Sequence, residues 1–330
     1  MTTVSLDAAR AWVVRIFTDH GASPEAARSV AAALVGAEAE GLKGHGLSRI
    51  LTYLVMLTSG KIDGQAVPTA TRVRAATLAV DAANGFAYPA VDLALKELPA
   101  IVRETGIAAA AIARSNHAGA LGAHVEKLAD AGLIALFFAN TPEAIAPAGG
   151  TKAVYGTNPI AFACPLPGRP AIVVDLALST VARGNIVAAN QKGEAIPEGW
   201  ALDPDGNPTT DAAKALKGTM VALGGAKGTA LALMVEVLAA ALTGAHLAFE
   251  ASSFLDDKGP PPGTGQTILA IDPAAFGHAR FGERITALAG AIEAQAGVRL
   301  PGQRRLKLRQ RAAAEGISLP ADLVAKFGAP

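Results

Sequence analysis

Residues 77–178 alternate short apolar segments with longer segments of helical periodicity, and this alternation limits the possible folds most strongly. The apolar segments read TLAVDA, IAAAAIA, LIALFFAN, NPIAFACP and AIVVDLAL. Two of the intervals between them read YPAVDLALKELPAIVRETG and LGAHVEKLADAG. Short apolar runs bounded by turn residues predict strands, whereas the two intervals predict amphipathic helices. The chain is therefore expected to be an α/β protein.

Helix-start signals are found near the N-terminus. Ser5 predicts the cap of a helix that ends near Gly21, and Ser23 followed by Pro24 predicts the start of a second. A third helix is predicted from about residue 47 to residue 59. Serine accepts the free N–H groups of a first helical turn, and proline fits that turn because it has no N–H to lose.

The second half of the chain is less regular. The run EAIPEGWALDPDGNPTTD predicts a long loop. A long helix is predicted from about Thr229, then a strand at TILAID, then a helical region from about Phe276. We therefore expect three parts: an N-terminal helical region (1–75), an α/β region (76–275) and a C-terminal helical segment (276–330).

The composition excludes several classes of protein. Charged residues make up 17% of the chain and the net charge is +1, so nothing predicts binding to nucleic acid or to an anionic membrane. The most apolar stretch, GTALALMVEVLAAALTGAHLAF, contains Glu236, and we interpret it as a buried helix rather than a membrane span. The lone Cys164 and the absence of a signal-peptide pattern predict a reducing, cytoplasmic location.

Common catalytic motifs do not match. The turn after TLAVDA reads NGFAYP, which is not the dinucleotide-binding G-x-G-x-x-G. No histidine has metal-ligand spacing and no G-x-S-x-G elbow occurs, so we expect neither a metal site nor that hydrolase type. The turn LGGAKGT is not a Walker motif either. Its glycines and Lys227 still predict a phosphate site at a helix start, with a chance Gly-rich turn as the alternative.

Three segments carry candidate site residues. In EAEGLKGHGLSRI, a helix beginning near His45 would place His45 and Arg49 on one face. Arginine binds carboxylates bidentately and histidine exchanges protons, so the pair suits a carboxylate substrate. A helix-start histidine with a solvated arginine is the alternative. His117 in RSNHAGALG follows a strand, and Thr157 lies in the rigid loop before another strand; both positions suit a ligand site or a simple turn.

Taken in order, these segments resemble a known family. They are EGLKGHGLSRI, DAANGFAYPAV, RSNHAGALG, YGTNPIAFACP, VVDLALST, PTTDAAKALKG, GGAKGTALALMVEVLAAALTG and LPGQRR. The set is similar to the NAD(P)-dependent malate/L-lactate dehydrogenase family, which is not of the Rossmann type. The resemblance implies a mixed, largely antiparallel sheet flanked by helical regions, with the C-terminal segment packing back on the N-terminal part. It also implies a homodimer with a site between domains.

Within the family, the chain looks most like the Δ1-piperideine-2-carboxylate/Δ1-pyrroline-2-carboxylate reductases. These reduce cyclic ketimines to L-pipecolate and L-proline with NADPH. The alternative is a 2-hydroxy acid dehydrogenase of the malate, L-lactate, sulfolactate or ureidoglycolate type. A third possibility is a member that binds NAD(P) without turnover, against which the presence of both His45 and Arg49 argues.

The resemblance also implies roles for individual residues. His45 is the proton donor and Arg49 the carboxylate clamp. The other substrate positions are Thr157, Arg183 and Gly184. The cofactor positions are His117, Ala118, Gly119, Ala120, Leu121, Asp175, Leu176, Ala177, Gly224, Gly225, Lys227, Gly302, Arg304 and Arg305. The basic cluster in LPGQRRLKLR predicts NADPH over NADH, with Arg304 or Arg305 at the 2′-phosphate.

Two positions depart from the family pattern. Gly44 stands where a serine usually precedes the catalytic histidine, and Asn185 stands where the reductases have an aspartate that acts with that serine. A carboxylate partner would raise the pKa of a histidine and fix its tautomer. His45 is therefore expected to have a lowered pKa, which weakly favours an imine that arrives already protonated.

Overall fold

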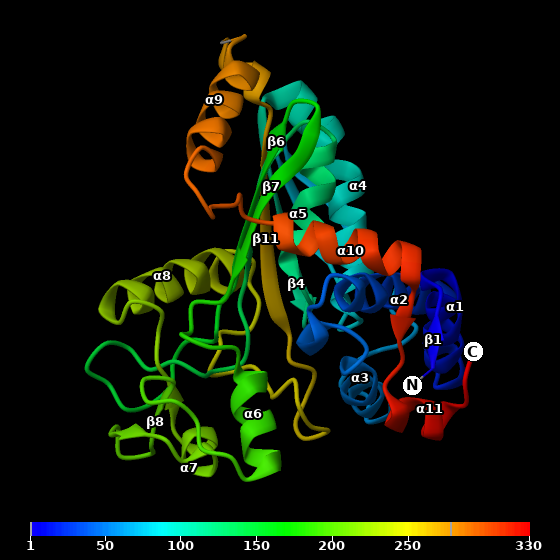
Figure 1. The fold of residues 1–330 in the computed structure, drawn as a ribbon, viewed down its shortest axis with the longest axis vertical. Coiled ribbons are helices and arrows are strands. Elements are labelled where there is room, and N and C mark those ends of the chain that lie inside the picture. Colours follow the sequence, from blue (N-terminus) through cyan, green and yellow to red (C-terminus); the bar gives the residue numbers. More distant parts are fainter. Residues whose placement is uncertain (1, 278) are drawn as a thin grey trace.

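The computed structural model describes residues 2–277 and 279–330, and helices form its N-terminal part (Figure 1). They are α1 (Leu6–Asp19), α2 (Pro24–Ala39), the 3₁₀ turn η1 (Lys43–His45) and α3 (Arg49–Thr58). The predicted caps are present: the Oγ of Ser5 accepts the Ala8 N–H and the Oγ of Ser23 accepts the Ala26 N–H, each at 3.2 Å. The helices pack around buried Trp12 and Phe17.

One seven-stranded sheet forms the centre, in the order β2-β3-β4-β11-β5-β6-β7. Its strands are β2 (Thr69–Arg74), β3 (Thr77–Asp81), β4 (Ile107–Ser115), β5 (Ile134–Ala139), β6 (Ile160–Leu166), β7 (Arg169–Leu176) and β11 (Thr264–Ile271). Within this sheet only β3 and β4 pair in parallel, and the other neighbours are antiparallel. The predicted mixed, largely antiparallel sheet is confirmed.

Helices cover both faces of this sheet (Figure 1). On one face, α4 (Ala87–Thr105) and α5 (Leu121–Asp130) bury the side of the sheet that includes Phe137. On the other face, α8 (Ala226–Glu236) and the π-helical turn η2 (Val237–Ala241) pack against Phe138. Consecutive strand residues point to opposite faces, so Phe137 and Phe138 belong to different cores.

A smaller lobe occupies residues 183–220. It contains α6 (Arg183–Lys192), α7 (Ala212–Lys217) and a three-stranded sheet of β8 (Ala201–Leu202), β9 (Pro208–Thr209) and β10 (Thr219–Met220). Most of the predicted long loop is irregular, but it includes β8 and β9. The sequence analysis missed α6 because Ile186 is its only buried side chain, which leaves no apolar period to detect.

The C-terminal elements form two groups. The 3₁₀ turn η3 (Pro273–Phe276) follows β11, and α9 (Phe281–Glu293) packs on β6 and β7, away from the N-terminal helices (Figure 1). The elements that return to the N-terminal helices are α10 (Gln303–Glu315), β12 (Ile317–Ser318) and α11 (Ala321–Phe327). Strand β12 pairs with β1 (Thr3–Val4), and Nε1 of Trp12 donates to the carbonyl oxygen of Gly328 at 2.8 Å. At the other boundary, β2 lies before residue 76 and pairs with β3 after it, so the sheet crosses the division drawn from the sequence.

Two differences from the sequence analysis concern elements. Strand β2 was not predicted, because it is an exposed edge strand without apolar alternation. Helix α8, interpreted as buried, begins at Ala226 and leaves large apolar side chains exposed: Leu231 is 43% exposed and Leu233 49%. No helix in the described part of the chain is long and apolar enough to cross a membrane.

Candidate active site

His45 lies in a tight turn that is followed by a closely packed glycine, Gly46. It ends η1, and Arg49 begins α3, so the two residues do not share one helix as predicted. A Cβ at Gly46 would collide with the Glu38 carboxylate, which accepts the Leu47 N–H at 3.0 Å. Arg49 is nonetheless tied to the turn, because its Nε donates to the carbonyl oxygen of Gly44 at 2.7 Å. A side-chain-to-backbone hydrogen bond, rather than a shared helix, thus keeps Arg49 close to His45.

His117 faces His45 across the site. It follows β4, and its ring stacks on that of His45 with centroids 5.4 Å apart and planes 7° apart. The Tyr53 hydroxyl is hydrogen-bonded to Nδ1 of His117 at 2.6 Å and to the Tyr88 hydroxyl at 2.9 Å. Tyr53 and Tyr88 were missed by the sequence analysis. Tyr53 could have been found, since it lies one helical turn after Arg49.

The electrostatics of this group favour neutral rings. Burial, and then the charge of Arg49, lower the pKa of His45 to about 4. Burial, Arg49 and His45 together lower the pKa of His117 well below 6.5. Burial raises the pKa of Tyr53 to about 12. Nδ1 of His45 is buried and has no hydrogen-bond partner in the described part of the chain, so nothing here counteracts its desolvation.

Thr157 lies at the same end of the sheet as His117. Its backbone N–H donates to Oγ1 of Thr141 at 2.9 Å, and Thr141 follows β5 as His117 follows β4. The neighbouring Asn158 has φ of 37° and is fully buried. Its side-chain amide donates to the Glu236 carboxylate at 2.8 Å. This strained residue is held by Glu236, which fixes the loop that presents Thr157.

Glu236 is a buried carboxylate held by neutral donors. It accepts from Asn140 at 3.2 Å, from Asn158 and from the Ala248 N–H at 2.7 Å. Burial raises the pKa of Glu236, and these three hydrogen bonds oppose that rise. The residue that excluded a membrane span in the sequence is therefore a hub for two loops at the site end of the sheet.

Arg183, Gly184 and Asn185 belong to the first turn of α6 in the smaller lobe. Nη1 of Arg183 donates to the carbonyl oxygen of Glu143 at 3.2 Å, and burial lowers the pKa of Arg183. Gly184 and Asn185 are exposed. Among the described residues no hydrogen bond joins these three to His45 or His117.

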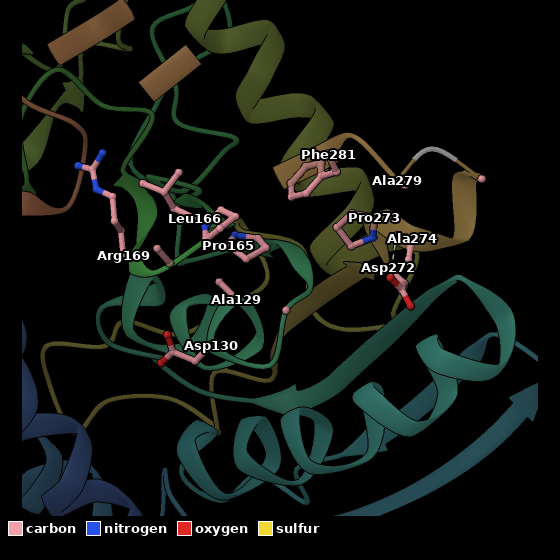
Figure 2. A pocket seen from close by; sticks show the side chains of 14 residues that line it. Ala129, Asp130, Pro165, Leu166, Arg169, Asp272, Pro273, Ala274, Ala279 and Phe281 are labelled. Atoms are coloured by element: carbon pink, nitrogen blue, oxygen red, sulfur yellow. Dashed lines mark hydrogen bonds between the residues drawn. The ribbon is translucent and has the colours of Figure 1, made fainter. Parts of the chain in front are cut away.

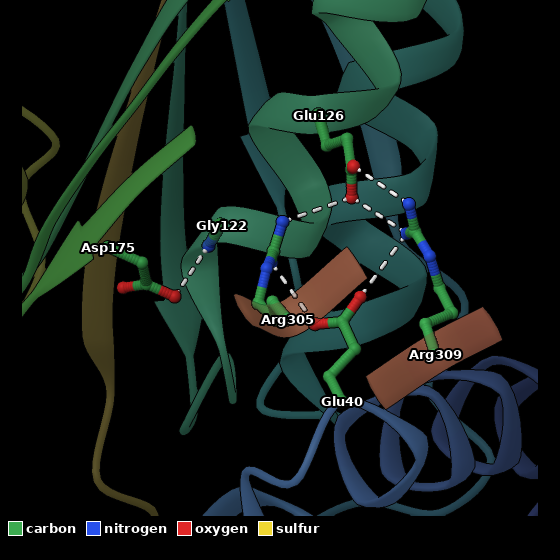
Figure 3. Close-up of polar contacts among 6 residues, drawn as sticks. All are labelled: Glu40, Gly122, Glu126, Asp175, Arg305 and Arg309. Atoms are coloured by element: carbon green, nitrogen blue, oxygen red, sulfur yellow. Dashed lines mark hydrogen bonds and ion pairs between the residues drawn. The ribbon is translucent and has the colours of Figure 1, made fainter. Parts of the chain in front are cut away.

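The segment from His117 to Leu121 leads into α5 and meets β7. The Asp175 carboxylate accepts the Gly122 N–H at 2.7 Å and so caps the first turn of α5 (Figure 3). A Cβ at Gly122 would lie 3.0 Å from Nη1 of Arg305 and 3.0 Å from Cβ of Asp175. Gly302 packs against Val173 of the same strand. These predicted cofactor positions are therefore contiguous in space.

Arg305 is already paired with two carboxylates (Figure 3). It contacts Glu40 at 3.2 Å and Glu126 at 3.1 Å, and Arg309 contacts the same two carboxylates at 3.2 and 2.9 Å. The Glu40 and Glu126 side chains are 4% and 11% exposed. Arg304 is exposed and has no side-chain partner in the described residues. Of the two arginines, Arg304 has the free guanidinium.

The turn before α8 forms a separate group. Gly224 and Gly225 have φ of 67° and 62°, a region that favours glycine, and no side chain caps the first turn of α8. The turn therefore exposes N–H groups next to Lys227, as an anion site requires. However, α8 and α10 lie on opposite sides of the sheet (Figure 1). Within a single chain, this turn and Arg304 therefore do not belong to the same site.

A cavity of about 760 Å³ lies at the other end of the sheet, between the β6–β7 hairpin and α9 (Figure 2). Leu166, Arg169, Asp272 and Phe281 are among the residues that line it. It contains none of the predicted site residues, and its Arg169 is paired with Glu293 at 2.7 Å. Volume alone therefore does not locate the chemistry. In the described residues, no three His, Cys, Asp or Glu side chains form a metal-binding group.

Comparison with known proteins gives consistent relatives. The family model for malate/L-lactate dehydrogenase matches residues 4–327. The (2R)-3-sulfolactate dehydrogenase (NADP(+)) of Chromohalobacter salexigens is 47% identical over 97% of this chain and 96% of its own. The Δ1-pyrroline-2-carboxylate reductase of Ancylobacter novellus is 42% identical over 94% and 92%.

The similar solved structures include the same two kinds of enzyme, a ketimine reductase and a sulfolactate dehydrogenase. The Δ1-piperideine-2-carboxylate reductase from Pseudomonas syringae pvar. tomato superposes with a TM-score of 0.94 at 39% identity, covering 99% of both chains. A sulfolactate dehydrogenase from Methanocaldococcus jannaschii has a TM-score of 0.89 at 27% identity. The match spans the helical regions, the sheet and the smaller lobe together. The chain is thus an oxidoreductase that belongs to the malate/L-lactate dehydrogenase family, as its ordered motifs predicted.

Proposed function

We propose that this oxidoreductase reduces cyclic ketimine carboxylates, Δ1-piperideine-2-carboxylate or Δ1-pyrroline-2-carboxylate, to L-pipecolate or L-proline. The observation that carries the proposal is the environment of His45: its Nδ1 has no hydrogen-bond partner among the described residues, and burial lowers its pKa to about 4. A ketone needs a proton from its acid during reduction, whereas an iminium ion brings its own. A largely neutral His45 therefore serves an iminium better than a ketone.

His45 keeps the role of proton donor for substrate that arrives as the neutral imine. The ring must then first be charged, and a bound substrate carboxylate next to it would raise its pKa. Substrate that arrives as the iminium ion already carries this proton. Arg49 is the clamp for that carboxylate. Its Nε is fixed to Gly44, which leaves its two terminal nitrogens for a bidentate contact. Thr157, Arg183 and Gly184 remain proposed substrate contacts.

A 2-hydroxy acid dehydrogenase is the second candidate, favoured by the 47% identical sulfolactate dehydrogenase. A neutral imidazole is also what an enzyme needs to accept the proton of an alcohol during oxidation. The same geometry therefore fits oxidation of a hydroxy acid such as (2R)-3-sulfolactate. It fits reduction of the matching keto acid less well, because a ketone carries no proton of its own and every turnover would need a protonated His45.

The cofactor is a nicotinamide dinucleotide, NADPH by preference with NADH as the alternative, and it supplies the hydride when bound. The proposed site is the contiguous group formed by the His117–Leu121 segment, Asp175–Ala177, Gly302 and Arg304. Gly122 brings α5 close to both β7 and α10 there. The free guanidinium of Arg304 makes it the better reader of the 2′-phosphate than the paired Arg305.

We also propose a homodimer in which a second copy covers α8. Large apolar side chains exposed together along one helix are typical of an interaction surface, and Leu231, Leu233 and Val237 are 43%, 49% and 50% exposed. The Gly224–Gly225 turn with Lys227 lies at the start of this helix, so a second copy would cover the proposed phosphate turn as well. Light scattering of the wild type and of Leu233→Glu checks this, and a monomeric wild type contradicts it.

The substrate assay separates the two functions. Purified enzyme is tested with NADPH against both ketimine carboxylates, pyruvate and oxaloacetate, and with NADP⁺ against (2R)-3-sulfolactate. The main proposal expects kcat/KM for an imine to exceed that for every keto acid. Turnover of sulfolactate with no imine reduction would establish the second candidate instead. An imine analogue without its carboxylate should be a poor substrate because Arg49 has nothing to hold.

A further inference from the structure

Lys61 is a buried lysine whose ammonium group donates hydrogen bonds to backbone carbonyl oxygens. Its side chain is 1% exposed. The Nζ donates to the carbonyl oxygens of Ser253 at 2.7 Å, Asp256 at 3.1 Å and Lys258 at 2.8 Å. The Asp256 carboxylate lies farther away, at 3.5 Å. An ammonium group has three N–H donors, so these carbonyls satisfy it completely.

The three carbonyls belong to the 252–260 loop, which is otherwise largely exposed. Leu255, for example, is 47% exposed. The exception is Phe254, which is 8% exposed and lies with its ring edge against His117, centroids 5.5 Å apart and planes at 65°. Phe254 therefore closes one side of the imidazole pair, and Lys61 supplies three hydrogen bonds to the loop that carries it.

Lys61 is also linked to α3. It follows α3, the helix that carries Arg49 and Tyr53, and the Ile62 N–H donates to the carbonyl oxygen of Met56 in that helix at 3.0 Å. We propose that Lys61 is a positioning residue of the active site, which ties the 252–260 loop to the end of α3 so that Phe254 stays against His117.

This inference rests on the proposed function, because it takes the His45–His117 pair as the reaction centre. Without the ammonium group, the three carbonyls would turn to water and the loop would loosen. Phe254 would then leave His117, and water would reach both rings. The titratable or charged groups that face the two imidazoles are Arg49, Tyr53 and each other. The loop brings no charge to them, so its release should act through solvation and raise both pKa values toward 6.5.

The test compares wild type with Lys61→Met, which keeps the apolar stem and removes the donors. Hydrogen exchange followed by mass spectrometry should show faster exchange in residues 252–260. An NMR titration should show the pKa of His117 rising toward 6.5. With the best substrate from the assay above, kcat/KM should fall by about 10- to 100-fold, the scale of a small misplacement of reacting groups. Lys258→Met removes an exposed ammonium from the same loop but leaves its carbonyl, and it should behave as wild type.

Phe254→Leu tests the second half of the idea without touching Lys61. It should raise the pKa of His117 while exchange in the loop stays as in wild type, and this arm holds even if Lys61→Met does not fold. An unchanged titration in both variants, with only a lower Tm for Lys61→Met, would overturn the proposal because Lys61 would then be merely structural. Exchange and titration need no substrate. They therefore judge the Lys61 contact even if no imine is reduced, whereas the assay alone judges the function.

Discussion

Two clusters of ionisable side chains lie close to the proposed ligand sites, and they are built in opposite ways. In the first, His45, His117 and Tyr53 are desolvated with little compensation, and within residues 2–277 and 279–330 no group is hydrogen-bonded to Nδ1 of His45. In the second, Glu40 and Glu126 face Arg305 and Arg309, so two negative charges meet two positive ones. Both clusters are largely buried, but only the second is balanced.

This difference assigns the first cluster to the reaction and the second to the support of the fold. An uncompensated imidazole stays neutral and can change its protonation when substrate arrives, because a single new charge shifts its pKa strongly. A balanced set of two carboxylates and two guanidiniums resists such a change, and it holds α10 against α2 and α5. The first arrangement suits proton transfer, and the second suits a rigid wall for a cofactor.

The largest expected effect, on kcat, follows from removing the imidazole ring of His45. His45→Ala should lower kcat by about 10²–10⁴-fold, the usual contribution of a positioned acid or base. Affinity for NADPH should change little, because His45 is proposed to contact the substrate. Steady-state kinetics and cofactor titration by fluorescence measure both. Turnover close to that of wild type would remove His45 from the mechanism and turn attention to His117.

Unbalancing the second cluster should reduce stability rather than chemistry. Glu126→Gln leaves one positive charge excess, and we expect a loss of about 3 kcal/mol in the free energy of unfolding, the low end for a buried pair. The low end applies because the Arg309 side chain is 40% exposed. The control is Glu315→Gln on the same helix. It breaks an exposed pair with Arg311 and should leave the free energy of unfolding almost unchanged. Equal losses in urea unfolding would contradict the comparison.

Replacing the two neighbouring arginines of α10 should have different effects on cofactor affinity. Arg304→Ala should weaken NADPH by roughly ten- to a hundred-fold, since a charge-assisted hydrogen bond contributes about 1.5–3 kcal/mol. NADH affinity should stay almost unchanged. Arg305→Ala should instead lower stability, because it leaves Glu40 and Glu126 short of one partner. Equal losses for the two cofactors in Arg304→Ala would show that this residue does not read the phosphate.

The smallest expected effect concerns His124, a buried ring outside both clusters. Burial lowers its pKa to about 4, from the ordinary value of 6.5. Between these two values the unfolded chain binds more protons than the folded one, so stability falls as the pH drops through this window. From pH 7 to pH 5 one such histidine costs about 2 kcal/mol. Urea unfolding of His124→Gln at both pH values should show a pH-dependent loss smaller by that amount, and an equal loss would refute the assignment.

The local signals of the sequence were sufficient for much of the fold. Ser5 and Ser23 with Pro24 marked helix starts, and the alternating segments marked β3 to β7 and their helices, because caps and side-chain periodicity act within a few residues. Elements without that local imprint were missed. The exposed strand β2 and the weakly amphipathic helix α6 are stabilised by neighbours that their own residues do not reveal.

For the site, the sequence determined the residue types and, through the ordered motifs, the family. Only the tertiary structure decided how those residues meet. It stacked His117 on His45, engaged Arg305 with Glu40 and Glu126 so that Arg304 stays free, and placed the turn before α8 on the far side of the sheet. Desolvation and ion pairing depend on segments distant in the chain that fold together, and no local pattern records which segments those are.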